Sequence, residues 1–202
     1  MGKTPAVKLN RICVYCGSSP GGDPEYAQAA ESLGTLLADS GIGLVYGGGN
    51  VGLMHLVAEA ALAKKGEVIG VIPHSLEQKE LAHRGLTELL VVKSMHERKQ
   101  KMADLADAFI ALPGGIGTLE EIIEVFTWLQ LDFHEKPIGL LNVCGFYDQL
   151  LEFLHHMVKQ KFLKDEQLEM LQVSSDPIAL LDKLQTFIPV KTAKWFDRRN
   201  ET

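Results

Sequence analysis

The chain has 202 residues, 46% of them hydrophobic, which is enough for one α/β domain with a sheet covered on both faces. Its net charge of −6 argues against a protein that binds nucleic-acid polymers, and three cysteines cannot form a disulfide framework. No apolar run reaches membrane-spanning length, and the first residues lack the apolar core of a secretory leader. We therefore expect a cytoplasmic protein that contacts no membrane.

Short apolar runs alternate with helical patterns along the whole chain. In chain order the patterns predict a strand at 11–15, a helix at 24–39, a strand at 42–46, a helix at 53–64, strands at 67–72 and 86–92, a helix at 95–105, a strand at 108–112, a helix at 119–133, a strand at 137–143, and helices at 147–160 and 177–187. This order predicts a Rossmann-like α/β fold, a doubly wound parallel sheet with helices on both faces. No linker divides the chain, so we expect a single domain at 1–190 and a polar tail at 191–202.

Three glycine-rich turns follow predicted strands, at residues 16–22, 46–52 and 113–118. Ligands bind at the carboxyl ends of parallel strands, so the three turns are expected to share one edge and form a cleft for a nucleotide-sized ligand. The backbone N–H groups of the third turn, and the start of the helix behind it, suit a phosphate. In the other two turns, the candidate binding residues are Ser18, Gly48 and Gly49.

Other patterns in the sequence point to cofactor or metal chemistry but lack the necessary context. The second turn matches the G-x-G-x-x-G dinucleotide pattern, yet the next strand does not end in the acidic residue that binds ribose hydroxyls. Cys13 and Cys16 have the spacing of a redox pair, but Cys13 is expected inside a strand. The histidine spacing matches no metal motif. We therefore expect no cofactor and no metal.

Two charged residues, Arg98 and Glu121, stand near the starts of two predicted helices that follow consecutive strands. Glu121 follows Thr118 at the spacing of a capping box, so a purely structural role stays open, and Arg98 could be an ordinary surface residue. Topology allows both side chains to face one cleft. A carboxylate held anionic near a helix N-terminus can stabilise the oxocarbenium-like state of glycosidic cleavage, and an arginine can balance a phosphate.

Residues 113–121 resemble the PGGxGTxxE signature of the LONELY GUY (LOG) family of nucleotide phosphoribohydrolases, and residues 95–99 resemble the second motif of that family. Both motifs stand in the family's order. Further similar stretches lie at residues 16–19, 46–49, 52–54 and 80–89. The resemblance covers residues 11 to 185, nearly the whole predicted domain.

The resemblance implies hydrolysis of the N-glycosidic bond of a nucleoside 5′-monophosphate to a free base and ribose 5-phosphate. The resemblance implies one of two substrates. One is a cytokinin riboside monophosphate, which the family hydrolyses in cytokinin biosynthesis, and the other is AMP. Arg98 and Glu121 are implied as the catalytic pair. The implied substrate-binding residues are Glu80, Lys99, Gly114, Gly115, Ile116, Gly117, Thr118 and Thr127. The family is generally homodimeric, which agrees with apolar residues around most of the helix predicted at 119–133.

Two alternatives remain beside this interpretation. The family has also been labelled lysine decarboxylase, a chemistry that needs a Schiff-base lysine and pyridoxal phosphate. The sequence singles out no such lysine, although Lys99 stands beside Arg98. The second alternative is a protein that binds or senses a nucleotide or sugar phosphate without turnover, because it would use the same glycine-rich turns.

Overall fold

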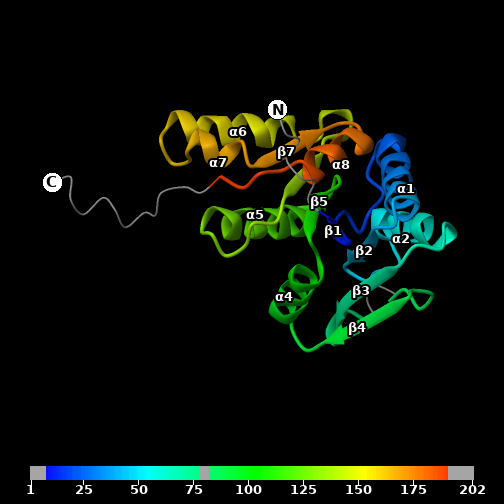
Figure 1. The fold of residues 1–202 in the computed structure, drawn as a ribbon. Helices are drawn as coiled ribbons and strands as arrows, with labels where there is room; N and C mark the ends of the chain where they lie inside the picture. Colours follow the sequence, from blue (N-terminus) through cyan, green and yellow to red (C-terminus); the bar gives the residue numbers. More distant parts are fainter. Residues whose placement is uncertain (1–7, 78–81, 191–202) are drawn as a thin grey trace.

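The computed structural model describes residues 8–77 and 82–190 (Figure 1). Glu80 and the predicted tail at 191–202 lie outside the described residues. Within the described ranges, every helix is too short or too polar to traverse a lipid bilayer.

Seven parallel strands form one sheet in the order β4-β3-β2-β1-β5-β6-β7. The strands are β1 (Arg11–Tyr15), β2 (Gly43–Tyr46), β3 (Val68–Pro73), β4 (Glu88–Val92), β5 (Ala108–Ala111), β6 (Ile138–Leu141) and β7 (Leu171–Ser174). The helices are α1 (Pro24–Asp39), α2 (Gly52–Ala63), α3 (His74–Glu77), α4 (Met95–Leu105), α5 (Ile116–Gln130), the 3-10 turn η1 (Val143–Gly145), α6 (Asp148–Lys159), α7 (Asp165–Leu168) and α8 (Pro177–Gln185). The strand order reverses between β1 and β5, where ligands bind in such sheets.

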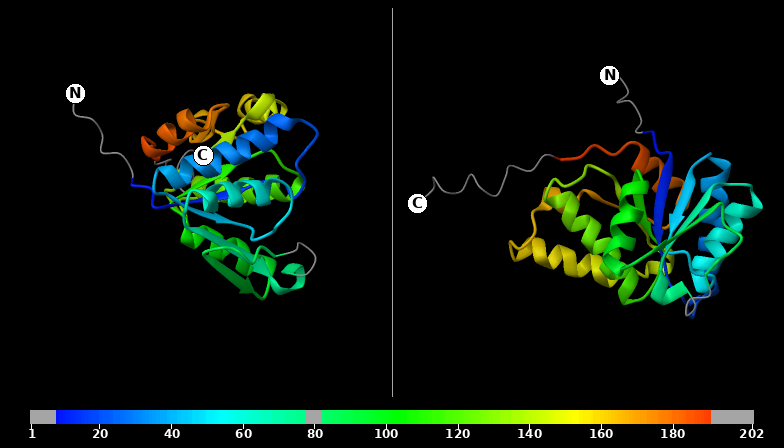
Figure 2. Two further views of the ribbon diagram at one scale, coloured as in Figure 1. Left: turned by 90° about the vertical axis from the view of Figure 1, so that its right-hand side faces the viewer. Right: turned by 90° about the horizontal axis from the view of Figure 1, so that it is seen from below.

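The sheet separates two hydrophobic cores because successive strand residues point to opposite faces. On β1, Ile12 and Val14 belong to the core formed with α1, α2 and α8. Cys13 and Tyr15 belong to the core formed with α4, α5 and α6. The two further views show helices on both sides of the twisted sheet (Figure 2). The predicted doubly wound α/β fold is therefore confirmed.

Most element boundaries agree with the sequence prediction. Strand β7, the single-turn helices α3 and α7 and the 3-10 turn η1 are absent from the prediction. Helix α5 begins at Ile116, three residues before the predicted start at Leu119. Helices α1 and α8 begin after Asp23 and Asp176, whose side chains accept backbone hydrogen bonds as expected of N-caps.

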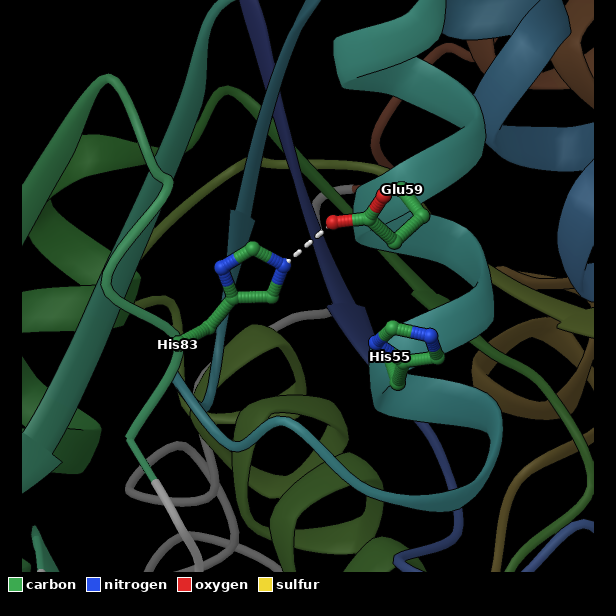
Figure 3. A group of neighbouring side chains, drawn as sticks. All are labelled: His55, Glu59 and His83. Carbon is green, nitrogen blue, oxygen red and sulfur yellow. Dashed lines mark hydrogen bonds and ion pairs between the residues drawn. The ribbon is translucent and has the colours of Figure 1, made fainter.

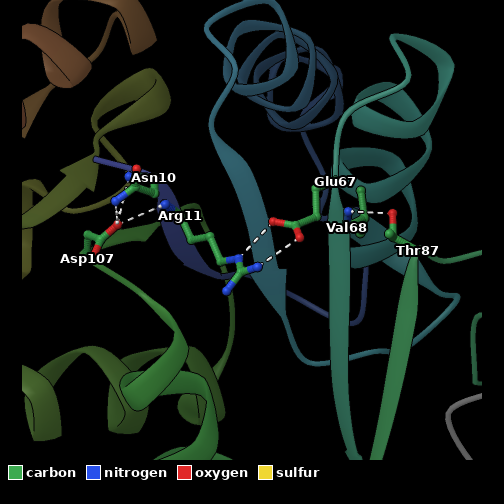
Figure 4. A network of polar contacts seen from close by, with 6 residues as sticks. All are labelled: Asn10, Arg11, Glu67, Val68, Thr87 and Asp107. Carbon is green, nitrogen blue, oxygen red and sulfur yellow. Dashed lines mark hydrogen bonds and ion pairs between the residues drawn. The ribbon is translucent and has the colours of Figure 1, made fainter. Parts of the chain in front are cut away.

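The amino-terminal edge of the sheet is tied together by polar side chains (Figure 4). The Asp107 carboxylate, just before β5, accepts hydrogen bonds from the backbone N–H groups of Asn10 at 2.7 Å and Arg11 at 3.0 Å. Arg11 forms a two-pronged ion pair with Glu67, which precedes β3, at 2.7 and 2.9 Å. These contacts join the starts of β1, β3 and β5. The glycine-rich turns lie at the opposite, carboxyl-terminal edge of the sheet.

Candidate active site

The three glycine-rich turns meet at the carboxyl edge of the sheet. Gly17 in the first turn donates from its backbone N–H to the carbonyl oxygen of Pro113 in the third turn, at 3.1 Å. The Gly17 carbonyl oxygen accepts from the N–H of Leu53, at the start of α2, at 3.0 Å. The first turn therefore connects the other two, as the predicted shared edge requires.

The first and third turns approach so closely that a side chain does not fit between them. A Cβ atom added at Gly114 would lie 2.9 Å from the backbone nitrogen of Gly17 and would overlap Thr118. Backbone atoms cannot move aside as a flexible side chain can. Glycine at position 114 is therefore needed for the contact between the turns.

A cavity of about 280 Å³ opens beside these turns. Its walls include Arg98 from α4 and Glu121 from α5, although the two residues lie on helices that follow different strands. The full lining consists of Cys16, Gly17, Ser18, Met54, Arg98, Gly115, Ile116, Gly117, Thr118 and Glu121. The structure thus brings together six predicted binding or catalytic residues from 98 to 121, with Ser18 from the first turn. Their chemical roles stay predictions.

The N-terminus of α5 faces this cavity without a side-chain cap. Gly115 is the N-cap residue and makes no side-chain hydrogen bond there. Thr118 is the third helical residue, so the capping box predicted for Thr118 and Glu121 is wrong. The helix start was mispredicted because the N-cap residue is a glycine, which has no side chain that could signal a helix start in the sequence. The first N–H groups of a helix lack intrahelical partners, so this end suits an anion.

Arg98 is buried, with only 6% of its surface exposed, and backbone carbonyl groups fix its guanidinium. Its Nε donates to the carbonyl oxygen of Val71 at 3.0 Å, and its Nη2 donates to that of Gly47 at 2.9 Å. Helix α4 begins as predicted, because the Ser94 hydroxyl accepts from the N–H of Glu97 at 3.1 Å. Arg98 is therefore not an ordinary surface arginine.

Cys13 and Cys16 are both buried free thiols. Burial is the main cause that raises the pKa of each thiol, and the nearby Glu121 charge raises it further. A thiol that stays protonated is a poor nucleophile. The arrangement therefore gives no support to a redox pair.

Lys99 does not line the cavity, in contrast to its neighbour Arg98. Its ammonium group bonds Glu120 at 2.6 Å and Glu124 at 3.0 Å on α5. Burial alone would lower the pKa of Lys99, but the bonds to these two carboxylates outweigh burial and raise it. A lysine held protonated is a poor Schiff-base nucleophile, so this residue does not suit pyridoxal chemistry.

Three further predicted binding residues are placed in structural contacts away from the cavity lining. The Thr127 hydroxyl donates to the carbonyl oxygen of Ile123 one turn earlier on α5, at 2.8 Å. Gly48 adopts a left-handed conformation with φ +74°, and Gly49 pairs with Ala82 in an isolated bridge. Both glycines shape the second turn.

A second cavity of about 200 Å³ adjoins the first and shares Gly17, Ser18 and Gly115 with it. Gly114, a predicted binding residue, lines this second cavity. Tyr26 and Phe146 form part of its wall and pack edge to face, with ring centroids 5.7 Å apart. Neither aromatic residue was predicted from the sequence, because no motif separates them from ordinary core residues.

Comparison with known proteins places the chain in a family. A family model described as "Possible lysine decarboxylase" matches residues 54–184. A cytokinin riboside 5′-monophosphate phosphoribohydrolase of Oryza sativa subsp. japonica is 48% identical over 182 residues, which are 90% of this chain and 75% of that protein. A relative of the same activity from Arabidopsis thaliana is 46% identical over 182 residues, 90% of this chain and 85% of that protein.

A solved structure of the molybdenum cofactor carrier protein from Chlamydomonas reinhardtii aligns with a TM-score of 0.65 and 21% identity, covering 88% of this chain and 98% of that one. At this identity the likeness shows a shared fold alone. The family assignment rests on the close sequence relatives, and each of the two motifs that resemble the family contributes residues to the cavity wall. The chain therefore belongs to the LONELY GUY (LOG) family, and the two relatives compared above are cytokinin riboside 5′-monophosphate phosphoribohydrolases.

Proposed function

We propose that the protein hydrolyses the N-glycosidic bond of a nucleoside 5′-monophosphate, with Arg98 and Glu121 as its catalytic pair. The observation that carries the proposal is the cavity of about 280 Å³, which joins these two side chains to the uncapped start of α5. The names of the relatives support the same reaction class.

The substrate phosphate is bound at the N-terminus of α5. Backbone N–H groups of residues 115–118 supply hydrogen-bond donors and the positive end of the helix dipole. The hydroxyls of Ser18 and Thr118, which also line the cavity, add donors. Arg98 supplies the compensating positive charge, and its bonds to Val71 and Gly47 hold that charge in place before the substrate binds.

Glu121 acts on the ribose. As the bond between C1′ and the base nitrogen lengthens, positive charge develops on the sugar, and an anionic carboxylate stabilises it. Glu121 also orients the water whose oxygen bonds to C1′. The base leaves with the bonding electron pair and takes up one proton, while the attacking water loses one to become the new hydroxyl on C1′, so the products are free base and ribose 5-phosphate.

The proposed substrates are AMP and a cytokinin riboside 5′-monophosphate, and the proposed location is the cytoplasm. We also infer a homodimer, since apolar side chains at the starts of the two helices that carry the catalytic pair are exposed. Ile116, at the start of α5, is 82% exposed, and Met95, at the start of α4, is also exposed. A second copy covering both would shield these side chains from water. Sedimentation velocity tests this point, and a monomer at micromolar concentration contradicts it.

The activity is tested by incubating the pure protein with AMP and with isopentenyladenosine monophosphate and measuring free base. Glu121→Gln keeps the side-chain size and removes the charge, so we expect turnover to fall by about 10²-fold or more while nucleotide affinity changes little. The matched control is Glu120→Gln, because Glu120 is the neighbouring carboxylate and faces Lys99 instead of the cavity. This control should retain wild-type turnover.

Two outcomes would remove the proposal. If the wild-type protein binds AMP but releases no base from either nucleotide, it is a nucleotide-binding or sensing protein without turnover. Equal turnover in the wild type and Glu121→Gln would exclude the carboxylate from the reaction.

A further inference from the structure

Three potential metal-binding side chains meet outside the proposed active site (Figure 3). His55 and Glu59 lie one turn apart on α2, and His83 lies on the segment that precedes β4. One ligand atom from each residue lies within 4.8 Å of the other two. None of the three lines either cavity described above, so the proposed reaction does not use them.

The ring of His55 is oriented as in many metal sites. Its Nδ1 lies 2.7 Å from the Oδ1 of Asn50, which can only accept a hydrogen bond. The ring proton is therefore on Nδ1, and Nε2 keeps its lone pair. Metal-ligating histidines usually donate their second ring N–H to such an acceptor, which fixes the ring and its tautomer.

Glu59 and His83 complete the cluster from opposite sides of the gap between α2 and the 82–85 segment. The Nε2 of His83 lies 2.7 Å from the Oε1 of Glu59. His83 is buried, whereas half of the Glu59 side chain is exposed. The buried imidazole provides a fixed ligand, and the exposed carboxylate leaves an entry path for an ion from solvent.

We propose that His55, Glu59 and His83 bind a divalent transition-metal ion, with Zn²⁺ the best match, and that water completes the coordination. Two imidazole nitrogens and one carboxylate oxygen form a donor set that Zn²⁺ uses in proteins, whereas Mg²⁺ and Ca²⁺ prefer oxygen ligands alone. The sequence offered only the one-turn spacing of His55 and Glu59 as a signal. The third ligand becomes apparent from the fold.

Binding requires a local rearrangement. The N–H of Gly85 donates to Nδ1 of His83 at 3.2 Å, so the His83 proton is on Nε2 and is shared with Glu59. An ion at Nε2 requires the proton at Nδ1 instead, and Gly85 then loses its acceptor. The Glu59 carboxylate also moves outward, since two ligands of one tetrahedral ion stand about 3.3 Å apart. The site is therefore weaker than a preformed structural zinc site.

An ion in this position would join α2 to the segment that packs on the second glycine-rich turn. The backbone N–H of His83 donates to the carbonyl oxygen of Gly48 at 3.0 Å, and Ala82 pairs with Gly49. The metal would thus stabilise this corner of the fold. An ion that binds only the folded state raises the unfolding temperature as its concentration increases.

The test is a calorimetric titration of the full chain with Zn²⁺, after treatment with a chelator and its removal. We expect one ion per chain. His55→Ala and Glu59→Gln, which change partly exposed or exposed side chains, should each weaken Zn²⁺ binding at least tenfold. The control is His156→Ala, because His156 is an exposed histidine on α6 outside the cluster. It should bind like the wild type.

A second readout uses Co²⁺ in place of Zn²⁺. Nitrogen and oxygen ligands in a tetrahedral arrangement should give the cobalt complex a visible absorption band, and His55→Ala should abolish that band. Base release by the metal-free His55→Ala variant should equal that of the metal-free wild type, so a failure of the metal proposal is separate from a failure of the proposed hydrolase. Zn²⁺ affinity that is unchanged in His55→Ala and Glu59→Gln, or no Zn²⁺ binding at all, would overturn the proposal.

Discussion

The Nη2 of Arg98 donates a 2.9 Å hydrogen bond to the carbonyl oxygen of Gly47, which links the start of α4 to the turn after β2. With the bond from Nε to Val71, the guanidinium is held by backbone atoms of two neighbouring segments of the sheet edge. Backbone carbonyls on a rigid sheet move little. The positive charge proposed to meet the substrate phosphate is therefore in position beforehand.

Gly47→Ala should reduce turnover by displacing Arg98. A Cβ atom at this position would overlap the Nη2 of Arg98, so the guanidinium must shift. A misplacement of about 1 Å can reduce a rate by about 10²-fold, and we expect a loss of that order in kcat with the fold intact. Gly22→Ala is the control, because no atom lies within 4 Å of its added Cβ. Base release and circular dichroism check both variants.

Gly114→Ala should destabilise the folded protein, whereas Gly115→Ala should not. A Cβ at Gly114 overlaps Thr118 and crowds Gly17, so we expect a destabilisation of about 1–3 kcal/mol. At Gly115 nothing lies within 4 Å of the added atom, so stability should change little. Urea unfolding measures both. Equal unfolding midpoints would show that the first and third turns do not need their close contact.

Lys99→Met should affect stability more than activity. The lysine joins α4 to Glu120 and Glu124 on α5, and its loss leaves two carboxylates without this counter-charge. We expect about 1 kcal/mol of destabilisation and less than a tenfold change in kcat/KM, since Lys99 does not line the cavity. Lys101→Met, at an exposed position of the same helix, is the control. A much larger loss of kcat/KM would instead support the substrate contact that the family resemblance implies.

His134 should make the protein less stable in mild acid. Its Nε2 donates to Val125 at 3.0 Å and its Nδ1 accepts from the N–H of Lys136 at 3.1 Å, so both ring nitrogens suit the neutral form. Burial, followed by the Lys136 charge, lowers the pKa of His134 below its ordinary value of 6.5. The unfolded state then binds more protons as the pH falls through about 6.5, and the free energy of unfolding decreases.

His134→Gln should remove this part of the pH dependence. Thermal unfolding of the variant and of the wild type, measured between about pH 7.5 and 5.5, gives the comparison. His156→Gln, at an exposed position, should keep the wild-type profile. If the His134→Gln and wild-type profiles were parallel, the ring would not titrate differently in the folded and unfolded states.

The fold was largely predictable because its elements carry local signals. Helix α1 follows an aspartate N-cap and begins with Pro24, and β1 is a short apolar run, so both were predicted with the observed bounds. Strand β7 has only four residues and includes the polar Gln172. Its place depends on pairing with β6, which a local pattern does not contain. Helix α5 was misplaced because its N-cap is a glycine.

The site was predictable where chemistry depends on short motifs and not where it depends on side-chain direction. The motif residues 114–118 with Arg98 and Glu121 line the two adjoining cavities. Lys99 lies next to Arg98 in the sequence, but neighbouring helical residues point about 100° apart, which turns Lys99 toward α5. The cluster of His55, Glu59 and His83 depends on a long-range approach that no local spacing reveals.

The polar contacts at the amino-terminal edge of the sheet matter for mutagenesis of this protein. They involve Asn10, Arg11, Glu67 and Asp107 (Figure 4). They anchor the strands at the end remote from the turns, so these contacts do not change when exposed residues of the turns are replaced. Libraries that randomise Ser19 and Pro20, two exposed residues of the first turn, can leave this anchorage untouched. Selection for new substrates can therefore proceed there with the anchored end of the sheet unchanged.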